Sequence, residues 1–428
     1  MSSAQTLYAW VTRFAVPLAS LYLTYRARKQ PDYSKHWDER FGWKPFPAPE
    51  ADQPRLWLHA VSLGETVAAR PLIEAFLTAH PQAQILLTCM TPTGRDAGEK
   101  IAQKFPGKIV QCYLPYDTPE LMGKFLDDTR PNMGVVMETE VWPNLMHQAQ
   151  KRAIPVVLAN ARESEKSAKI AERFISVMRP AFAAFKAVLA QSREDAERLR
   201  HLGAQNIHIC GSMKFDLKAD VEQVATAKAY KEKLARPVIL LASTRDTEEA
   251  MFVESIKNGT HEAIVLLVPR HPQRFNDVAE LLKENGISFV RKSQDPELKS
   301  VTQQTRVILG DTMGEMSFYC AMADVCLMGG SFGGFGSQNL IEPAASGAPV
   351  ILGPSTFNFA KPADDAVAMG AAERVENARE GFDKACMWLT DGRFSERSQK
   401  AKAFAQSYTG ATQKQMAVIE EIWSEISK

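Results

Sequence analysis

Four charged side chains come directly after short apolar segments, the position where α/β proteins usually place functional groups: Glu65, Glu138, Glu140 and Lys214. A carboxylate held beside a substrate hydroxyl removes its proton, and a lysine balances the negative charge that develops on a leaving group. Glu65 closes the segment His59-Ala-Val-Ser-Leu-Gly-Glu65, where Gly64 allows a tight turn and a helix is expected to begin near Thr66. Two structural interpretations stay open: Glu65 as an acid that stabilises a helix N-terminus, and Lys214 as an exposed surface side chain.

The pair Glu138 and Glu140 belongs to the segment Met137-Glu-Thr-Glu-Val-Trp-Pro-Asn144. Strand alternation points both carboxylates to one side if the strand continues through them. Metal binding is one possibility for such a pair. The sequence contains no Asp-x-Asp pair, however, so it gives no evidence for a metal-dependent sugar transferase. We expect Trp142 and Pro143 to begin the next helix.

The second half of the chain carries strand-end cations and a segment rich in glycine. Arg245 and Arg270 each follow an apolar run, and a guanidinium binds phosphate or carboxylate in bidentate fashion. Five glycines lie between Gly329 and Gly336, after an apolar run and before an expected helix. Backbone N–H groups there can approach an anion closely, and the helix N-terminus favours negative charge. Glu342 falls in the first turn of that helix, where it could accept hydrogen bonds from a ribose diol.

Two known patterns fail in this segment. The dinucleotide fingerprint G-x-G-x-x-G is not satisfied, because Asn339 occupies the position of the last glycine after Gly334 and Gly336. The nucleophile pattern G-x-S-x-G is matched around Ser331, but that motif needs a helix immediately after the serine, and more glycines follow here. None of the eight histidines can be assigned as its partner. The sequence therefore disfavours a dinucleotide dehydrogenase and a serine hydrolase.

Short apolar runs alternate with amphipathic stretches in two sets along the chain. The first set of runs is Arg55–Ser62, Gln84–Met90, Ile109–Leu114, Met133–Met137, Ile154–Leu158, Ala187–Ala190 and Ile207–Cys210. The second set is Pro237–Ala242, Ala263–Val268, Ile287–Val290, Arg306–Leu309, Asp324–Met328 and Ala348–Leu352. These runs are apolar on both faces, which is typical of parallel strands covered by helices. The pattern predicts an α/β protein with two doubly wound, Rossmann-like domains and a ligand-binding crevice between them, beyond the carboxyl ends of the strands.

The N-terminal segment is the most apolar part of the chain. Leu7–Tyr25 holds 14 apolar residues out of 19, and its length just reaches the ~20 residues that a spanning helix needs. Arg13 and Pro17 stand in its middle, so a helix that lies in the membrane interface is the competing interpretation, and an ordinary core helix is the third. The basic residues that follow keep the rest of the chain cytoplasmic by the positive-inside rule and attract anionic lipid: Arg26, Arg28 and Lys29.

Composition excludes several classes of protein. Of the 428 residues, 45% are hydrophobic and 24% are charged, which is typical of a globular protein rather than a disordered or multi-span membrane protein. The net charge of +1 gives no basic field of the kind that nucleic-acid binding needs. The six cysteines form no C-x-x-C pair, which indicates scattered thiols of a reducing compartment rather than a zinc site.

Taken together, the segments resemble one family, the 3-deoxy-D-manno-octulosonic acid (Kdo) transferases of lipid A and lipopolysaccharide biosynthesis. The matching blocks cover nearly the whole chain after the apolar N-terminus, in this order: Trp37–Gly42, His59–Glu65, Thr91–Gly94, Leu114–Asp117, Met137–Asn144, Asn160–Arg162, Gly211–Asp216, Pro269–Pro272, Gly310–Glu315, Gly329–Ser331 and Asn339–Ala345. Eleven ordered matches are far more specific than any one of them.

The resemblance implies an inverting glycosyltransferase of the two-domain GT-B fold, with CMP-Kdo as donor and the membrane lipid IVA as acceptor. It implies that the enzyme acts at the cytoplasmic side of the inner membrane, whose surface is anionic. It also implies that the reaction needs no cofactor and no metal. Glu65 matches the family's catalytic base, and Glu138 and Lys214 match its transition-state stabilisers; Lys214 would balance the sugar carboxylate or the leaving phosphate. The implied CMP contacts are Pro269, Arg270, Met313, Gly314, Glu315, Asn339, Leu340, Ile341 and Glu342.

The chain departs from the family pattern at two places. In the glycine segment the family usually has His-Asn-Pro-Leu-Glu, whereas this chain has Gln338-Asn-Leu-Ile-Glu342 and keeps only the Asn and the Glu. Arg245 and Asp246 stand where His and Glu are common.

The expected organisation follows from these observations. We expect an N-terminal membrane-anchor helix in residues 1–30, an acceptor-binding domain in 31–216, a linker in 217–236, a nucleotide-sugar-binding domain in 237–404, and a C-terminal helix in 405–428 that returns to the first domain. Another nucleotide-sugar enzyme of the same fold, such as a different lipid glycosyltransferase or an epimerase, is the alternative function. A non-catalytic membrane-associated binding protein is the third.

Overall fold

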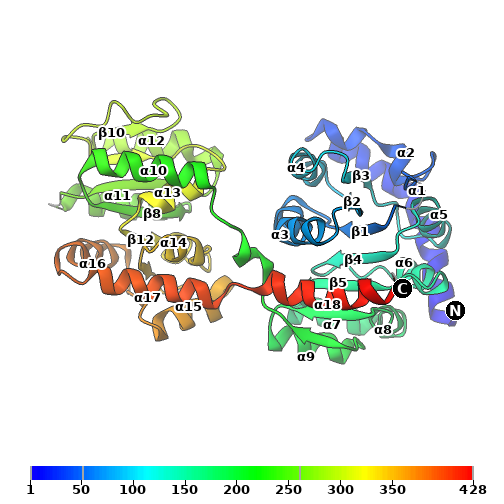
Figure 1. The fold of residues 1–428 in the computed structure, drawn as a ribbon. Helices are drawn as coiled ribbons and strands as arrows, with labels where there is room; N and C mark the ends of the chain where they lie inside the picture. Colours follow the sequence, from blue (N-terminus) through cyan, green and yellow to red (C-terminus); the bar gives the residue numbers. More distant parts are fainter. Residues whose placement is uncertain (1, 51–52, 260–261, 427–428) are drawn as a thin grey trace. The chain divides into compact units, whose positions relative to one another are not determined.

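The computed structural model describes residues 2–50, 53–259 and 262–426 (Figure 1). The chain forms two compact units, and each is described by itself. Unit 1 comprises Met1–Leu217 and Thr409–Lys428, and unit 2 comprises Lys218–Tyr408. The second segment of unit 1 is contributed by the C-terminal end of the chain.

Unit 1 is built on a parallel sheet of seven strands in the order β3-β2-β1-β4-β5-β6-β7. The strands are β1 (Arg55–His59), β2 (Gln84–Cys89), β3 (Ile109–Tyr113), β4 (Met133–Met137), β5 (Val156–Ala161), β6 (Ala187–Ala190) and β7 (Ile207–Ile209). All seven expected apolar runs contain a strand, because runs buried on both faces are stable only inside such a sheet. The strand order reverses at β1, which pairs with β2 on one side and β4 on the other.

Helices cover both faces of this sheet, each over its own hydrophobic core. They are α3 (Leu63–Ala79), α4 (Pro92–Ala102), α5 (Pro119–Thr129), α6 (Pro143–Lys151), α7 (Glu165–Arg173), α8 (Ile175–Ala183), α9 (Arg193–Leu202) and α18 (Ala411–Ile426). The ends of α9 show how local sequence delimits a helix. The Ser192 hydroxyl accepts a hydrogen bond from Asp195 N (3.0 Å) at the start of α9, and Gly203 ends it with a φ of 113°. Pro143 is the first residue of α6, as expected.

Unit 2 repeats the architecture with a second parallel sheet of seven strands, in the order β10-β11-β9-β8-β12-β13-β14. The strands are β8 (Val238–Thr244), β9 (Ile264–Pro269), β10 (Phe289–Arg291), β11 (Val307–Leu309), β12 (Val325–Met328), β13 (Val350–Leu352) and β14 (Ala372–Arg374). Six correspond to the expected second set. The short edge strand β14 was not expected, because Ala372-Glu-Arg374 has no apolar run.

The helices of unit 2 are α10 (Val221–Leu234), α11 (Glu248–Asn258), α12 (Phe275–Glu284), α13 (Met316–Met322), α14 (Ile341–Ala345), α15 (Ala360–Ala368), α16 (Ala378–Thr390) and α17 (Phe394–Ser407). The expected linker at residues 217–236 is wrong for most of its length, because α10 occupies it. Ala, Lys, Glu and Gln are strong helix formers, and the Asp220 carboxylate caps the helix by accepting from Glu222 N and Gln223 N (3.0 Å each). Ala227 is fully buried, so α10 belongs to unit 2 rather than to a free connection.

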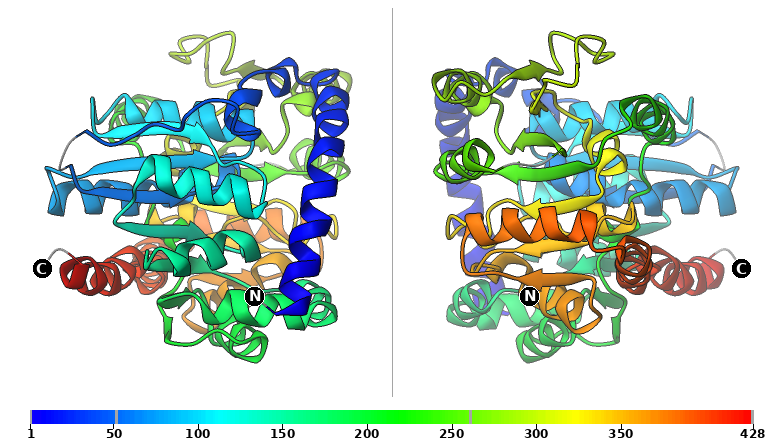
Figure 2. Two further views of the ribbon diagram at one scale, coloured as in Figure 1. Left: turned by 90° about the vertical axis from the view of Figure 1, so that its right-hand side faces the viewer. Right: turned by 90° about the vertical axis from the view of Figure 1, so that its left-hand side faces the viewer.

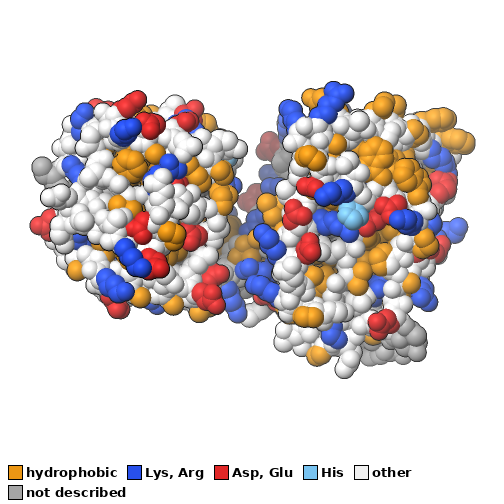
Figure 3. Space-filling model, turned by 90° about the horizontal axis from the view of Figure 1, so that it is seen from above, with side chains coloured by type: hydrophobic (Ala, Val, Ile, Leu, Met, Phe, Trp, Pro, Cys, Tyr) orange, Lys and Arg blue, Asp and Glu red, His pale blue; other side chains and the backbone are white. Residues whose placement is uncertain are grey.

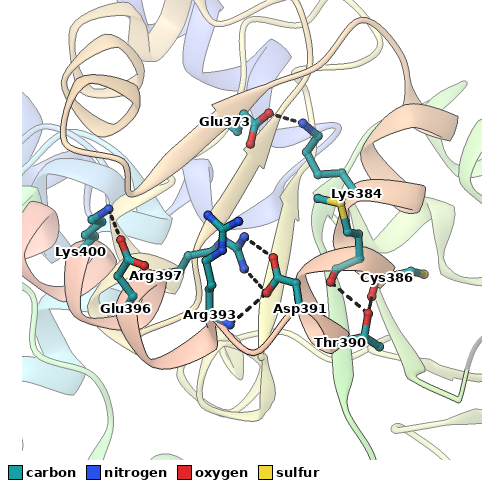
Figure 4. A network of polar contacts seen from close by, with 10 residues as sticks. Glu373, Lys384, Cys386, Thr390, Asp391, Arg393, Glu396, Arg397 and Lys400 are labelled. Carbon is teal, nitrogen blue, oxygen red and sulfur yellow. Dashed lines mark hydrogen bonds and ion pairs between the residues drawn. The ribbon is translucent and has the colours of Figure 1, made fainter.

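The turn between α16 and α17 is held by a network of ion pairs (Figure 4). The Arg397 guanidinium donates to both Asp391 carboxylate oxygens (2.8 and 2.5 Å), which lowers the pKa of that carboxyl, and it lies 4.7 Å from the ring centroid of Trp388. Lys384 pairs with Glu373 beside it. These contacts fix the path of the chain from one helix to the next, and none of them involves a residue expected at the site.

The N-terminal segment forms α1 (Ser3–Ala27), which lies lengthwise along one side of unit 1 (Figure 2). Two short helices follow it, η1 (Pro31–Ser34) and α2 (Trp37–Arg40). The Tyr8 hydroxyl donates to Asp117 Oδ2 (2.9 Å), and Asp117 also accepts from Asn144 N and Leu145 N at the start of α6 (3.1 and 2.9 Å). No helix in the described part of the chain combines the length and apolar character that crossing a bilayer needs.

Candidate active site

In unit 1 the expected catalytic residues come after strands at the carboxyl edge of the sheet. Glu65 lies in the first turn of the helix that follows β1, Glu138 directly follows β4, and Lys214 lies in the 3₁₀ helix η2 (Met213–Asp216) after β7. Because β1 and β4 are neighbours at the point where the strand order reverses, their following loops meet at the position where such sheets bind ligands.

The buried Glu138 carboxylate forms ion pairs with two partly exposed cations, Lys214 and Arg162. The Glu138 side chain is 1% exposed, with Lys214 Nζ at 2.6 Å from Oε1 and Arg162 Nε at 2.8 Å from Oε2. Two cations therefore share one carboxylate, and the cluster carries a net positive charge. Such a cluster stabilises an anion that approaches it.

The chain bends sharply at Glu138, whose φ of 57° lies in the left-handed region. Glu138 and Glu140 were expected to point to the same side only if the strand continued through them, and that condition is not met, because β4 ends at Met137. The Glu140 carboxylate instead accepts from Trp142 Nε1 (2.8 Å). Burial raises the pKa of Glu140, with a further contribution from the charge of Glu138.

Asn160 connects the loops that carry this cluster. Its side-chain oxygen accepts from Met213 N (3.0 Å), next to Lys214, and its Nδ2 lies 3.4 Å from Glu138 Oε1. Its own backbone N–H donates to the side chain of Gln415 (2.8 Å), which is fully buried on α18. The C-terminal helix α18 therefore supports the Glu138–Lys214–Arg162 cluster through Gln415 and Asn160.

Asp216 ties the same helix to the Lys214 segment, because its carboxylate accepts from Gly410 N and Thr412 N (2.6 and 2.5 Å). Gln415 was missed in the sequence, although a signal was present. It is a polar residue at helical spacing among Ala411, Met416 and Ile419, and a buried polar residue on an apolar face usually has a specific partner.

Glu65 lies in the first turn of α3, which begins at Leu63 rather than near Thr66, so Gly64 is helical instead of forming a tight turn. Its Oε2 accepts from Val61 N (2.7 Å), which agrees with the structural interpretation of Glu65 as an acid that stabilises a helix N-terminus. Burial raises the pKa of Glu65 to about 7, and the charges of Glu140 and Glu138 raise it further. The hydrogen bond from Val61 N and the charge of Lys214 lower the pKa and so oppose this rise. A carboxyl with this pKa is suited to general-base work near neutral pH.

His59, in the same segment, is not available for proton transfer. It is fully buried, with Nδ1 2.9 Å from the Thr88 hydroxyl and the Trp142 ring at 5.9 Å between ring centroids. Burial lowers its pKa to about 3, so it stays neutral. Its ring packs at the end of β1 against the rings of Trp57 and Trp142.

In unit 2 the expected donor contacts also gather at the carboxyl edge of the sheet. Pro269 ends β9, Arg270 follows it, residues 313–315 come after β11, and residues 339–342 lead into α14. Met313 is 62% exposed, whereas Leu340 and Ile341 are buried, so any ligand contact from that pair comes from the backbone.

The polar residues in these two loops are held in place. Asn339 Oδ1 accepts from Ile341 N (3.1 Å), and Glu315 lies 3.6 Å from the Lys292 ammonium. Burial raises the pKa of Glu342, and the Arg270 guanidinium opposes that rise, so these two side chains face the same region.

Several backbone N–H groups of the glycine-rich segment already donate hydrogen bonds within the protein, so they are not available to an anion as expected. The buried Glu248 carboxylate accepts from Gly330 N (2.7 Å), and from Phe332 N and Gly333 N (2.9 Å each). The loop is therefore organised by an acid of the chain itself. Glu248 was missed because nothing in its local sequence points to a glycine loop 82 residues later.

Ser331 is buried and structural, in agreement with the rejection of a nucleophile motif. Its hydroxyl donates to Met328 O and accepts from Gly353 N (2.5 and 2.8 Å). Within the described residues, no group of three or more His, Cys, Asp or Glu side chains is arranged to hold a metal ion. All six cysteines are free thiols, five of them buried.

Comparison with known proteins gives a consistent result. Residues 35–217 match a family model described as 3-deoxy-D-manno-octulosonic-acid transferase (kdotransferase). The chain is 40% identical to a 3-deoxy-D-manno-octulosonic acid transferase of Bordetella pertussis over 97% of this chain and 98% of that protein. It is 35% identical to the protein of the same name from Haemophilus influenzae over 80% of each.

Two solved structures resemble the whole architecture. A glycosyltransferase from Rickettsia africae matches with a TM-score of 0.59 and 13% identity, over 87% of this chain and 99% of that one. A UDP-GlcNAc 2-epimerase from Neisseria meningitidis, bound to UDP-GlcNAc, matches with a TM-score of 0.56 and 13% identity, over 87% and 100%. At such identities the likeness shows the fold alone, two parallel-sheet α/β domains resembling GT-B glycosyltransferases.

Proposed function

The chain belongs to the 3-deoxy-D-manno-octulosonic acid transferase family, and we propose that it moves Kdo from CMP-Kdo onto the lipid A precursor lipid IVA with inversion at the anomeric carbon. It is a glycosyltransferase, as its relatives are. Unit 1 takes the acceptor and unit 2 takes the donor. The observation that carries the proposal is the position of Glu65 in the first turn after β1, where the charges of Glu138 and its partner Lys214 act on its carboxyl and burial raises its pKa to about 7.

The reaction is a single displacement. The acceptor hydroxyl oxygen bonds to the anomeric carbon of Kdo, the bond from that carbon to the CMP phosphate oxygen breaks, and the hydroxyl proton passes to Glu65. Positive charge develops on the sugar and negative charge on the phosphate. Arg270 and the loops at 313–315 and 339–342 hold CMP, while Lys214, oriented by Glu138, stabilises the charge that develops. The scheme uses side-chain cations for this purpose and assigns no metal or cofactor.

The function is tested with the purified full chain, CMP-Kdo and lipid IVA. We expect Kdo-bearing lipid IVA and free CMP as products, and the mass of the lipid counts the Kdo units added. Binding of CMP in preference to UDP or GDP is the control for the donor. A folded chain that prefers UDP, or that transfers or epimerises another sugar, would contradict the proposal and favour the alternative of a different nucleotide-sugar enzyme.

We also propose that α1 attaches unit 1 to the anionic cytoplasmic surface of the inner membrane by lying in the interface. One side of the helix packs on the protein, where Ala9 and Leu23 are buried. The opposite side exposes a stripe of large apolar residues at helical spacing, each more than half exposed: Leu7, Trp10, Val11, Phe14, Leu18, Leu21, Tyr22 and Tyr25. Figure 3, which views the protein from above, shows that hydrophobic side chains, with Lys and Arg among them, are also plentiful on unit 1. An exposed apolar stripe with basic residues at its end is typical of an interfacial helix.

Substitution of Phe14 and Leu18 by Asp together should reduce binding to vesicles that contain anionic phospholipid by tenfold or more, measured by flotation. Each of these side chains contributes about 1.5–3 kcal/mol when it is fully transferred from water to an apolar environment. Val221→Asp is the matched control, because Val221 is 80% exposed and lies on unit 2. Unchanged flotation of the double variant, or an equal loss in the control, would reject α1 as the attachment element.

A further inference from the structure

Two arginines leave neighbouring strand ends in unit 2 side by side. Thr244 and Pro269 are paired across β8 and β9, and Arg270 N donates to Thr244 O (2.9 Å). Arg245 and Arg270 are the next residue on each strand. Two like charges at adjacent positions repel each other unless an anion lies between them.

No acid of the described chain forms an ion pair with either guanidinium within 4.0 Å. The acids near Arg245 are engaged elsewhere. Asp246 pairs with Arg274 (3.2 Å), and the Glu248 carboxylate is taken up by backbone N–H groups, including that of Arg245 itself (2.8 Å). Arg270 interacts with the Glu342 carboxyl only beyond 4.0 Å, and the Arg245 guanidinium has no acid partner within that distance in the described chain.

The position of the Arg245 side chain is defined by an aromatic ring. Its guanidinium carbon lies 4.7 Å from the centroid of the Phe335 ring, which belongs to the glycine-rich segment. A guanidinium stacked in this way keeps its N–H edges available for a carboxylate or phosphate. Desolvation, together with the charges of Arg245 and Arg270, lowers the pKa of the neighbouring His271, which shows that both charges act on the same small region.

The donor of the proposed function carries two anionic groups close together. Kdo is a 2-keto acid sugar, so its carboxylate and the phosphate oxygen of CMP are bonded to the same anomeric carbon. Unit 2 has Arg270 for the phosphate, whereas Lys214 belongs to unit 1 and is held at 2.6 Å by Glu138. A second cation beside Arg270 matches the second anion of the donor.

We propose that Arg245 binds the carboxylate of the donor sugar, next to Arg270 at the phosphate, and so determines the preference for acidic 2-keto sugars over neutral ones. This inference rests on the proposed function, because it takes CMP-Kdo as the donor. It assigns a specificity-determining role to Arg245, which follows β8 and whose side chain contacts the Phe335 ring but no acid in the described structure.

The experiment compares the affinity for CMP with that for CMP-Kdo in the full chain, without acceptor, by titration calorimetry. CMP lacks the sugar carboxylate, so Arg245→Gln should leave the Kd for CMP within about twofold and raise the Kd for CMP-Kdo tenfold or more. Arg245→Lys should recover part of the loss, because it restores the charge without the bidentate geometry. Arg379→Gln, which removes an exposed arginine elsewhere in unit 2, should change neither Kd.

The other outcomes distinguish failure of this inference from failure of the proposed function. An equal loss of CMP and CMP-Kdo affinity in Arg245→Gln would overturn the inference, since Arg245 would then support the nucleotide or the loop through Phe335. Unchanged affinity of Arg245→Gln for CMP-Kdo would also overturn the inference. Kdo transfer by the wild-type protein would then show that the proposed function still holds. A wild-type chain that binds CMP-Kdo no better than UDP-sugars would instead contradict the proposed function itself.

Discussion

Glu65→Gln is expected to lower Kdo transfer by about 10²–10⁴-fold, the range that a positioned general base contributes. The substitution removes the proton acceptor and little else. Glutamine keeps the size of the side chain, and its amide oxygen can still accept from Val61 N as Glu65 Oε2 does at 2.7 Å, so the start of α3 should be preserved. The thermal midpoint and the Kd for CMP, which is bound by unit 2, should therefore stay close to their wild-type values.

The pH dependence gives a second signature of the same residue. The base must be ionised to accept a proton, and the pKa of Glu65 is raised to about 7. The wild-type rate should therefore fall tenfold per pH unit below about 7 and level off above it. The residual rate of Glu65→Gln should show no such limb. A variant that keeps both the wild-type rate and its acid limb would remove Glu65 from the role of base and turn attention to Glu140, whose pKa burial also raises.

The sheets and the position of the candidate site were predictable from sequence because both depend on local patterns. Runs such as Gln84–Met90 and Ala263–Val268 are apolar on both faces, and only a buried parallel strand accommodates such a run. The first charged residues after such runs lie at the carboxyl edge of the sheet. That rule singles out Glu65, Glu138 and Lys214 among the strand-end residues, and the family resemblance assigns their expected roles.

The contacts that complete the site were not predictable because they join distant parts of the chain. Glu248 enters the glycine-rich segment from another strand end, and Gln415 reaches Asn160 across 255 residues of sequence. A polar side chain signals that it needs a partner, but its sequence does not say which one. The sharp bend at Glu138 was likewise invisible, because a positive φ at a glutamate has no composition signal.

Helix propensity explains the wrong expectation at residues 217–236. That stretch lacks an apolar run, which favours a linker when hydrophobic periodicity alone is considered. Its Ala, Lys, Glu and Gln residues form a helix on intrinsic preference. The buried side chains of Ala227 and Leu234 and the Lys231–Asp324 ion pair (2.7 Å) hold α10 within unit 2. The polar composition therefore correctly indicated that the stretch holds no strand, but it did not reveal a helix that belongs to unit 2.

The second large effect is expected from Lys214→Met, which should lower kcat by about 10²–10³-fold, comparable to the loss of one charge-stabilising donor in other active sites. Methionine retains the apolar stem of the side chain and removes the ammonium that lies 2.6 Å from Glu138. Arg162 remains at 2.8 Å on the other carboxylate oxygen, so Glu138 is not left without a cation. The thermal midpoint is therefore expected to change less than it would if both cations were lost.

Lys214→Met should also move the acid limb of the rate profile, and the sign follows from charge. Lys214 lowers the pKa of Glu65, so its removal raises that pKa above about 7, and the base stays protonated up to a higher pH. Activity at neutral pH should fall more than activity in the alkaline range. Arg162→Met is the matched control, because it removes a cation from the same carboxylate at a side chain that is 57% exposed and has no resolved influence on Glu65. A similar loss and an identical limb in both variants would show that the cluster acts only as a structural support, because a direct role for Lys214 requires its variant alone to shift the limb.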